Sequence, residues 1–287
     1  MVRQCERTGS GTTKCPMPKG PIIVTGAASG IGQATAALLA AQGRDVVSLD
    51  VKEPAGPVAE HHHIDLADPD SIDSVVERLD GPYAALVNVA GVPGTVGPDL
   101  TMRVNLLGLR HLTEAMLPRL ADGGAIANVS SIAGNTWRKR RELIGDLLDT
   151  PDYRSGLDWW VEHGATVGTD HYTFSKEAVV VYTMRMAGVA RHRGIRCNDV
   201  APGPVETPIL PDFEQVTGAD QMRWMIDSVG RAAQPTDIAE VLAWLATGDN
   251  GWVNGQHIQV DGGFSSGITV GWIDRSTAPA ARSRDHW

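Results

Sequence analysis

A glycine-rich turn between a short apolar run and an alanine- and leucine-rich segment constrains the fold of this chain more than any other feature. The apolar run covers residues 22–25, the turn reads Thr-Gly-Ala-Ala-Ser-Gly-Ile-Gly over residues 25–32, and helical spacing of apolar residues continues to Gln42. A second apolar run covers residues 45–50. A strand, a glycine turn, a helix and a second strand in about thirty residues form a βαβ unit, which predicts a parallel sheet.

The same turn predicts a binding site for a dinucleotide. Gly26 allows a tight turn, Gly30 lets the backbone approach a pyrophosphate, and Gly32 lets the helix pack against the strand. The helix N-terminus offers free N–H groups and positive potential to phosphate. Asp50 follows Gly32 by 18 residues, where a carboxylate can bind the ribose hydroxyls. Because a carboxylate there also repels a 2′-phosphate, we expect NAD, with NADP left open by the nearby Lys52.

Apolar runs and helical patterns alternate along the rest of the chain. Further strands are expected near residues 84–88, 125–130, 195–201 and 258–260, and helices near residues 71–79, 100–120, 172–192 and 236–246. Continuous apolar strands separated by helices predict an α/β fold with a doubly wound parallel sheet, the Rossmann arrangement. We expect one such domain over residues 20–273, between a flexible N-terminal arm (1–19) and a flexible tail (274–287). Met17, within the arm, is a second candidate for the start of translation.

Composition narrows the classes of partner. The chain has 34 acidic and 25 basic residues, a net charge of −9, which argues against nucleic acid and anionic membranes because both need clustered positive charge. The sequence shows no apolar run of membrane-spanning length and no secretory h-region, and its three cysteines fit free thiols, so we expect a cytoplasmic protein. The run His61-His62-His63 predicts no metal site, because consecutive strand residues cannot all face one ion.

Several motifs, in order along the chain, resemble those of the short-chain dehydrogenase/reductase family. The turn itself has that family's TGxxxGIG form. The later motifs are Asn88-Val89-Ala90-Gly91, Asn105 within Val104-Asn105-Leu106, Ser130-Ser131, Tyr172-Thr173-Phe174-Ser175-Lys176, Pro202-Gly203-Pro204-Val205-Glu206-Thr207 and Asp261-Gly262-Gly263. Val89 stands where the family has a second Asn. The resemblance covers about residues 20–265 and implies a nicotinamide-dependent oxidoreductase.

The resemblance implies four catalytic residues, Asn105, Ser131, Tyr172 and Lys176. Tyr172 and Lys176 are four positions apart and project from one helix face. The ammonium and an oxidised nicotinamide are expected to lower the tyrosine pKa from its usual ~10, so that Tyr172 takes the alcohol proton, or donates it in ketone reduction. Ser131 is expected to bond the substrate oxygen, with the adjacent Ser130 as the alternative. Lys176 also bonds the nicotinamide ribose in the family, and Asn105 holds a water that links Lys176 to solvent.

The resemblance also implies cofactor contacts along the whole domain. The backbone of Val205 and the hydroxyl of Thr207 are expected beside the carboxamide. Asp65 resembles the acid that contacts adenine, unless it only precedes the helix near Ser71. The full expected set is Gly26, Ser29, Gly30, Ile31, Gly32, Asp50, Asp65, Leu66, Asn88, Ala90, Gly91, Tyr172, Lys176, Pro202, Gly203, Val205 and Thr207.

The interval between Ser131 and Tyr172 is unusually long for the family. Its 41 positions resemble the bacterial 3α-hydroxysteroid dehydrogenase/carbonyl reductase branch, which contains coniferyl-alcohol-dehydrogenase-like members. We expect a helical insertion over residues 135–170, either as a wall or lid of the substrate pocket or as a packing or oligomer contact. Its basic run, residues 138–141, is either a solvated face or a contact for a carboxylate or CoA phosphate. Residues 208–230 are expected to form a mobile substrate loop. Its candidate lining or core residues are Phe213, Met222, Trp224 and Met225.

These patterns together predict an NAD-dependent oxidoreductase acting on a bulky apolar secondary alcohol or ketone, such as a hydroxysteroid-like, aryl or terpene alcohol. One alternative is a catalytically silent NAD-binding regulator, which the intact set of four catalytic residues disfavours. Another is an acyl-chain ketoreductase, which Asp50 and the insertion fit less well. The expected partners are a small-molecule substrate and further copies of the chain, as a homodimer or homotetramer.

Overall fold

A parallel sheet of seven strands forms the centre of the molecule, with the strand order β5-β4-β3-β6-β7-β8-β9. The computed structural model describes residues 6–7, 13–14 and 17–279. The sheet strands are β3 (Ile22–Thr25), β4 (Val46–Asp50), β5 (Glu60–His63), β6 (Tyr83–Asn88), β7 (Leu120–Val129), β8 (Arg196–Pro202) and β9 (His257–Val260). Each neighbouring pair runs parallel, which confirms the doubly wound α/β fold.

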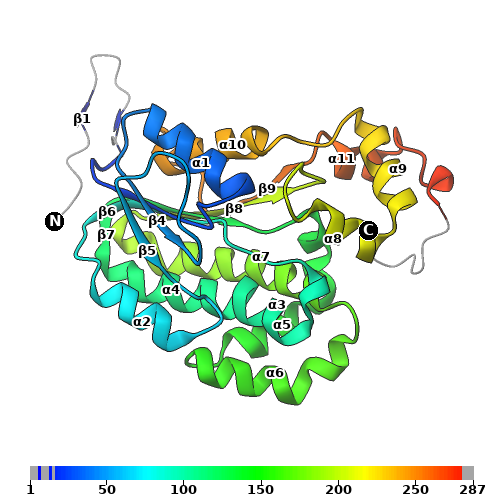
Figure 1. Cartoon of the computed structure of the whole chain (residues 1–287), viewed down its shortest axis with the longest axis horizontal. Coiled ribbons are helices and arrows are strands. Elements are labelled where there is room, and N and C mark those ends of the chain that lie inside the picture. Colours follow the sequence, from blue (N-terminus) through cyan, green and yellow to red (C-terminus); the bar gives the residue numbers. More distant parts are fainter. Residues whose placement is uncertain (1–5, 8–12, 15–16, 280–287) are drawn as a thin grey trace.

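Helices cover both faces of this sheet (Figure 1). One face carries α1 (Gly30–Ala41) and α10 (Pro235–Thr247). The other carries α2 (Pro69–Glu77), α4 (Leu109–Met116) and α7 (His171–Ala190). Side chains of β3 alternate between the two cores: Ile22 and Val24 pack with the first pair of helices and Ile23 with the second group. Because both faces are covered, the central strands read as continuous apolar runs rather than as alternating ones.

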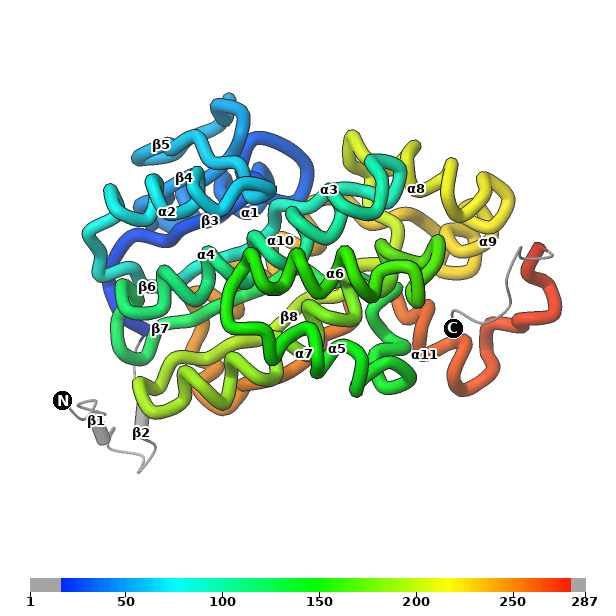
Figure 2. The backbone as a smooth tube through the Cα atoms, turned by 90° about the horizontal axis from the view of Figure 1, so that it is seen from below, coloured from blue at the N-terminus to red at the C-terminus, as the bar shows by residue number. Residues whose placement is uncertain are grey.

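The helical insertion lies outside the α4–α7 layer (Figure 2). It consists of the 3₁₀ helix η4 (Ile132–Arg140), α5 (Arg141–Leu148) and α6 (Tyr153–Val167). Trp160 is buried, stacks on Phe174 of α7 at 6.1 Å between ring centroids, and donates a hydrogen bond to Asp99 (Nε1–Oδ1 3.0 Å). The insertion therefore buries apolar surface of the domain against which it packs.

The segment expected as one helix over residues 100–120 contains a change of helix type. It runs through α3 (Pro98–Met102), a π-helical segment η2 (Arg103–Gly108), α4 and the 3₁₀ turn η3 (Leu117–Arg119). The short 3₁₀ turns η1 (Gly94–Val96) and η5 (Arg191–Arg193) flank other elements. π-helical turns inside α-helices are found frequently at functional sites, and this one contains Asn105.

Three segments that are expected to be flexible or mobile contain regular secondary structure. Residues 208–230, expected as a mobile loop, form α8 (Leu210–Thr217) and α9 (Ala219–Val229). The described part of the tail follows α11 (Phe264–Val270) and forms the 3₁₀ turn η6 (Arg275–Thr277), whose Thr277 accepts a hydrogen bond from Trp224 of α9 (Nε1–Oγ1 3.0 Å). In the arm, β1 (Glu6–Arg7) and β2 (Thr13–Lys14) pair antiparallel. The rest of the arm up to residue 16, and residues 280–287 of the tail, lie outside the described residues. Within the described ranges, no helix is long and apolar enough to cross a bilayer.

Candidate active site

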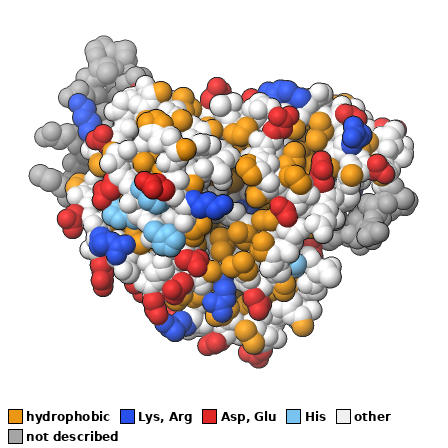
Figure 3. All heavy atoms as spheres, viewed as in Figure 1, with side chains coloured by type: hydrophobic (Ala, Val, Ile, Leu, Met, Phe, Trp, Pro, Cys, Tyr) orange, Lys and Arg blue, Asp and Glu red, His pale blue; other side chains and the backbone are white. Residues whose placement is uncertain are grey.

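A cavity of about 590 Å³ opens at the carboxyl ends of the central strands. The strand order reverses between β3 and β6, and ligands of open α/β sheets bind at such a switch point. Figure 3 shows this face of the molecule hollowed near its centre, with hydrophobic side chains gathered there. The expected site residues that line the cavity are Gly26, Ser29, Gly30, Ile31, Gly32, Ala90, Gly91, Ser131, Tyr172, Lys176, Pro202, Gly203, Val205 and Thr207.

The glycine-rich turn fits a phosphate-bearing ligand. Gly26 has φ +70°, and a Cβ there would lie 2.8 Å from the Cα of Ala90. A Cβ on Gly32 would lie 2.0 Å from the carbonyl oxygen of Gly26, so α1 approaches the turn closely only because this residue is glycine. The N-cap residue Ser29 makes no side-chain capping bond, although it precedes the free N–H groups of the helix. The turn therefore offers both shape and donors to a dinucleotide phosphate.

Asp50 ties the end of β4 to this turn. Its carboxylate accepts hydrogen bonds from the backbone N–H groups of Ala28 (Oδ2, 2.9 Å) and Lys52 (Oδ1, 2.9 Å). Each carboxylate oxygen can accept a second bond, so hydroxyl groups of a ribose can still be bound.

Four expected cofactor residues, Asp50 among them, are not part of the cavity wall. Asp65 is exposed and accepts a hydrogen bond from the backbone of Ala67 (2.8 Å), while Leu66 is buried in the apolar core. The carboxamide of Asn88 is buried and donates to Asn128 (2.8 Å) and to Thr113. The side chain of Asn88 therefore connects the sheet to α4, and a cofactor contact of this residue stays a prediction.

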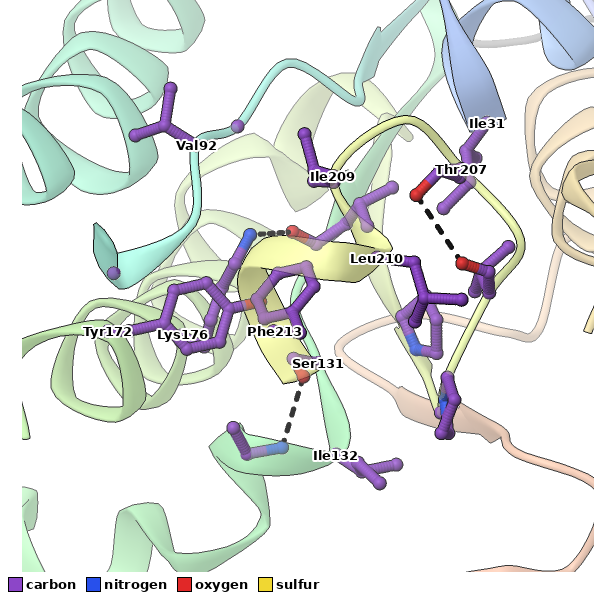
Figure 4. Close-up of a pocket in the computed structure, with 18 of the residues that line it drawn as sticks. Ile31, Val92, Ser131, Ile132, Tyr172, Lys176, Thr207, Ile209, Leu210 and Phe213 are labelled. Carbon is purple, nitrogen blue, oxygen red and sulfur yellow. Dashed lines mark hydrogen bonds between the residues drawn. The ribbon is translucent and has the colours of Figure 1, made fainter. Parts of the chain in front are cut away.

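Tyr172, Lys176 and Ser131 converge on one side of the cavity (Figure 4). The Lys176 Nζ donates to the carbonyl oxygen of Val129 (3.0 Å) and lies 5.9 Å from the centroid of the Tyr172 ring. The edge of that ring meets Phe213 of α8, with 5.1 Å between centroids. Tyr172 and the wall formed by α8 thus enclose the same space.

Burial, rather than the neighbouring lysine, dominates the charge state of Tyr172. Burial raises the pKa of Tyr172 to about 12, and a hydrogen bond with the Ser131 hydroxyl opposes this rise. Burial lowers the pKa of Lys176 to about 8, while the negative charge of Asp199 acts in the opposite direction. The lowered tyrosine pKa expected from the sequence is therefore not a property of the chain alone, because desolvation of the Tyr172 hydroxyl outweighs the opposing hydrogen bond with Ser131.

The two adjacent serines have different surroundings. Ser131 caps η4, accepting from the backbone of Ala133 (3.2 Å), and its hydroxyl reaches Tyr172. Ser130 is buried, and its hydroxyl donates to the carboxylate of Asp199. The geometry therefore favours Ser131 for contact with a substrate.

Asn105 lies behind the cavity wall rather than in it. Its Oδ1 accepts from the backbone N–H of Val92 (2.8 Å), and its Nδ2 donates to the carbonyl of Val92 (3.0 Å) and to the hydroxyl of Ser175 (3.3 Å). A Cβ on Gly91 would lie 3.3 Å from this Oδ1 and 3.5 Å from the Nζ of Lys176. Asn105 therefore fixes the loop after β6 and stands close to Lys176 across Gly91.

A hydrogen-bonded pair that the sequence did not indicate, Asp199 and His257, lies beside this centre. Asp199 is fully buried on β8, and its Oδ1 accepts from His257 of β9 (Nδ1, 2.6 Å) as well as from Ser130. The other ring nitrogen of His257 lies 2.8 Å from the Oδ1 of Asn135. The signal was a carboxylate within an apolar strand, since a buried charge needs a partner.

Arg140 belongs to the basic run of residues 138–141, which was expected either as a solvated face or as a contact for a carboxylate or CoA phosphate. It forms ion pairs with Asp170 (2.9 Å) and with the buried Glu177 (2.7 Å), at either end of the first turns of α7. Arg138 stacks on Trp137, 4.4 Å from the ring centroid. Arg140 thus positions the helix that carries Tyr172, instead of standing free for a substrate carboxylate or phosphate.

The wall opposite the glycine turn is mainly apolar. Its apolar members are Val92, Ile132, Ile209, Leu210, Phe213, Val216, Met222 and Met225. Of the four residues expected to line the cavity or to pack in a core, Phe213, Met222 and Met225 line the cavity. Trp224 instead packs on Phe264, with 5.5 Å between ring centroids. Within the expected insertion of residues 135–170, Thr169 and Asp170 line the cavity, whereas residues 135–168 do not, and α5 and α6 pack against α7.

The histidines of the run on β5 form hydrogen bonds with separate partners. His61 bonds Ser48 (3.1 Å) and His63 bonds the carbonyl of Val51 (3.1 Å). In the part of the chain that the structure describes, no group of three His, Cys, Asp or Glu side chains is arranged to hold a metal ion.

Comparison with known proteins agrees with this geometry. A family model described as short chain dehydrogenase matches residues 21–141, and one described as enoyl-(acyl carrier protein) reductase matches residues 159–265. The chain is 37% identical over 246 residues to a coniferyl-alcohol dehydrogenase of a Pseudomonas species, with 85% of this chain and 96% of that protein covered. It is 29% identical to the 3-alpha-hydroxysteroid dehydrogenase/carbonyl reductase of Comamonas testosteroni, with 85% and 96% covered.

A solved structure agrees as well. The crystal structure of the 3-alpha-hydroxysteroid dehydrogenase from a Pseudomonas species, complexed with NADH, superposes with a TM-score of 0.73 at 28% identity and covers 88% of this chain and 99% of that chain. With the shared fold, the glycine turn and the Ser–Tyr–Lys centre at the strand ends, the chain belongs to the short-chain dehydrogenase family of oxidoreductases.

Proposed function

We propose that this protein is an NAD-dependent dehydrogenase and carbonyl reductase for bulky, mainly apolar secondary alcohols and ketones. The observation that carries the proposal is the convergence of Ser131, Tyr172 and Lys176 on a cavity whose remaining wall is apolar. An apolar wall with a few convergent polar groups is typical of a site that binds and orients an organic substrate.

The residues of the chain supply position and proton transfer. Ser131 bonds the substrate oxygen and stabilises the charge that develops there. Tyr172 accepts the alcohol proton, or donates it during ketone reduction. Lys176 bonds the nicotinamide ribose, and Asn105 supports a water-mediated connection between Lys176 and solvent. The bound nicotinamide supplies the hydride acceptor or donor and, when oxidised, a positive charge that favours the phenolate of Tyr172.

Two observations support NAD as the cofactor. The carboxylate of Asp50 stands at the end of β4, fixed by two backbone N–H groups of its surroundings, and keeps acceptor capacity for ribose hydroxyls. The superposed 3-alpha-hydroxysteroid dehydrogenase was solved with NADH. Lys52 is exposed, and screening of Asp50 by its charge is what would admit NADP.

The substrate class is supported by the cavity and by the named relatives. Ile209, Leu210 and Phe213 of the segment after β8 face the same space as Tyr172 (Figure 4). The relatives named above act, by their names, on coniferyl alcohol, which is a primary alcohol, and on 3-alpha-hydroxysteroids, which are secondary alcohols, and both kinds of substrate contain rings.

The proposal is tested by following nicotinamide absorbance with NAD⁺ or NADP⁺ and a panel of hydroxysteroids, aryl alcohols and terpene alcohols. We expect NADH from at least one class, lost in Tyr172→Phe. Tyr182→Phe, which removes a hydroxyl from the buried part of the same helix, is the matched control and is expected to retain turnover. Tight NAD⁺ binding with no turnover of any class would instead favour a regulator, and turnover that survives in Tyr172→Phe would contradict the assigned role.

We also propose that the chain forms a homodimer or homotetramer, as the family resemblance implies. Light scattering of the purified protein gives its mass in solution, and a mass equal to one chain would contradict this proposal.

A further inference from the structure

One polar side chain stands out in the apolar wall of the cavity. Gln221 lies in the first turn of α9, lines the cavity, and has an exposed fraction of 8%. Among the described residues, its Oε1 is buried and has no hydrogen-bond partner. A buried amide without a partner is rare in folded proteins, because the lost hydration is not replaced.

The neighbours of Gln221 show where it stands relative to the reacting groups. Met225 follows it by four positions on the same face of α9, and both line the cavity. Met225 packs in a buried cluster with Ile132, which directly follows Ser131. Ile132 and Met225 form an apolar strip in which the segment that carries Ser131 meets the helix that carries Gln221. Gln221 and Ser131 therefore come from different elements that line the same cavity, α9 and the segment after β7.

A ligand can satisfy this amide where the chain does not. Water has little access to Gln221, which is 92% buried. The side chains of the neighbouring Met222 and Met225 have no hydrogen-bond donor. A hydroxyl group can donate to Oε1 and accept from Nε2, so it matches both halves of the carboxamide. The ring system between the two polar ends would lie along the apolar strip.

We propose that Gln221 binds a second hydroxyl group of the substrate, at the end remote from the carbon that is oxidised or reduced. The inference rests on the proposed function, and it narrows the substrate class to ring-containing alcohols and ketones that carry a distal hydroxyl. Gln221 is then a residue that determines specificity and takes no part in proton transfer.

The test compares matched substrates that differ only in the distal hydroxyl. One pair is 4-(1-hydroxyethyl)phenol and 1-phenylethanol, and a longer pair is 4-(4-hydroxyphenyl)cyclohexanol and 4-phenylcyclohexanol. We expect kcat/KM of the native enzyme to be roughly tenfold higher for the hydroxylated member of at least one pair, because its analogue leaves the buried amide unpaired. In Gln221→Met, which keeps the length of the side chain but removes its polar atoms, this ratio is expected to fall to about one, mainly through KM.

Two further variants sharpen the result. Gln221→Glu keeps an acceptor at the same position and is expected to retain the preference for the hydroxyl. Gln215→Met makes the same chemical change at an exposed position of α8 that does not line the cavity, and is expected to leave the ratio unchanged. These variants separate hydrogen bonding from a general effect of replacing glutamine.

The outcomes distinguish the two proposals. Equal kcat/KM for both members of each pair, or a preference that survives in Gln221→Met, overturns the role of Gln221 and leaves the dehydrogenase function in place. Absence of turnover with every member, with either cofactor, overturns the proposed function and this inference together.

Discussion

Replacing Lys176 with Met is expected to make the protein more stable while abolishing its activity. Lys176 has an exposed fraction of 5%, and burial lowers its pKa from 10.5 to about 8. A pKa difference of this size lowers the free energy of unfolding by roughly 3 kcal/mol, because the folded state holds a charged ammonium in an apolar environment. The reacting centre therefore destabilises the fold near neutrality.

The pH dependence follows from the direction of this shift. Below about pH 8, Lys176 is protonated in both states and the full cost is present. Between about pH 8 and the unfolded value of 10.5, the unfolded chain binds more protons, so the stability of the native protein rises with pH. Above that range the lysine is neutral in both states and its contribution vanishes.

The net gain of Lys176→Met is smaller than the gross cost. The variant loses the hydrogen bond from Nζ to the carbonyl of Val129, worth about 1 kcal/mol. At about pH 7 we therefore expect a gain of roughly 2 kcal/mol in the free energy of unfolding, which raises the melting temperature by roughly 4–8 °C. Near pH 9.5 the advantage is expected to shrink by about 2 kcal/mol, because the native protein has recovered most of its cost.

Urea unfolding followed by tryptophan fluorescence, at fixed protein concentration and at both pH values, measures this difference. Lys19→Met removes the charge of an exposed lysine and is expected to change stability by less than ~0.5 kcal/mol at either pH. A Lys176→Met variant that is less stable than the native protein near neutrality, or a gain that does not change with pH, would refute the reasoning.

Three further changes test other parts of the structure. Gly32→Ala places a methyl group 2.0 Å from a backbone oxygen and is expected to abolish cofactor binding in a calorimetric titration. The control Gly188→Ala changes an exposed glycine of α7 with open space around it, and is expected to stabilise the protein by about 0.5–1 kcal/mol in thermal unfolding. Asp50→Ala is expected to lower the ratio of kcat/KM for NAD to that for NADP by roughly tenfold, and an unchanged ratio would show that this carboxylate does not contact the ribose. Asp199→Asn removes a charge that raises the pKa of Lys176, so the alkaline fall of kcat/KM is expected at lower pH, and an unmoved profile would contradict this coupling.

Local sequence patterns determined the fold and the glycine-rich part of the cavity wall. The run of residues 22–50 contains a strand, a glycine turn, a helix and a strand, and each is set by spacing within a few residues. Gly26 and Gly32 were predictable because a turn this close to a ligand and to a helix excludes a Cβ whatever the rest of the chain does. The resemblance of the later motifs to those of the family implied that Ser131, Tyr172 and Lys176 belong to one site, and the structure brings them together.

Only the tertiary structure decided the charge states and the uses of individual side chains. The high pKa of Tyr172 follows from desolvation by surroundings far away in the sequence, and Ser130 is taken up by Asp199, 69 positions later. The same holds for the insertion: its helices are visible as a local pattern, but their place depends on contacts such as that of Trp160 with Asp99, 61 positions earlier. The periodicity of apolar residues reports on one or two turns of a helix. Burial, ion pairing and the unpaired Oε1 of Gln221 depend instead on which distant segments the fold brings into contact.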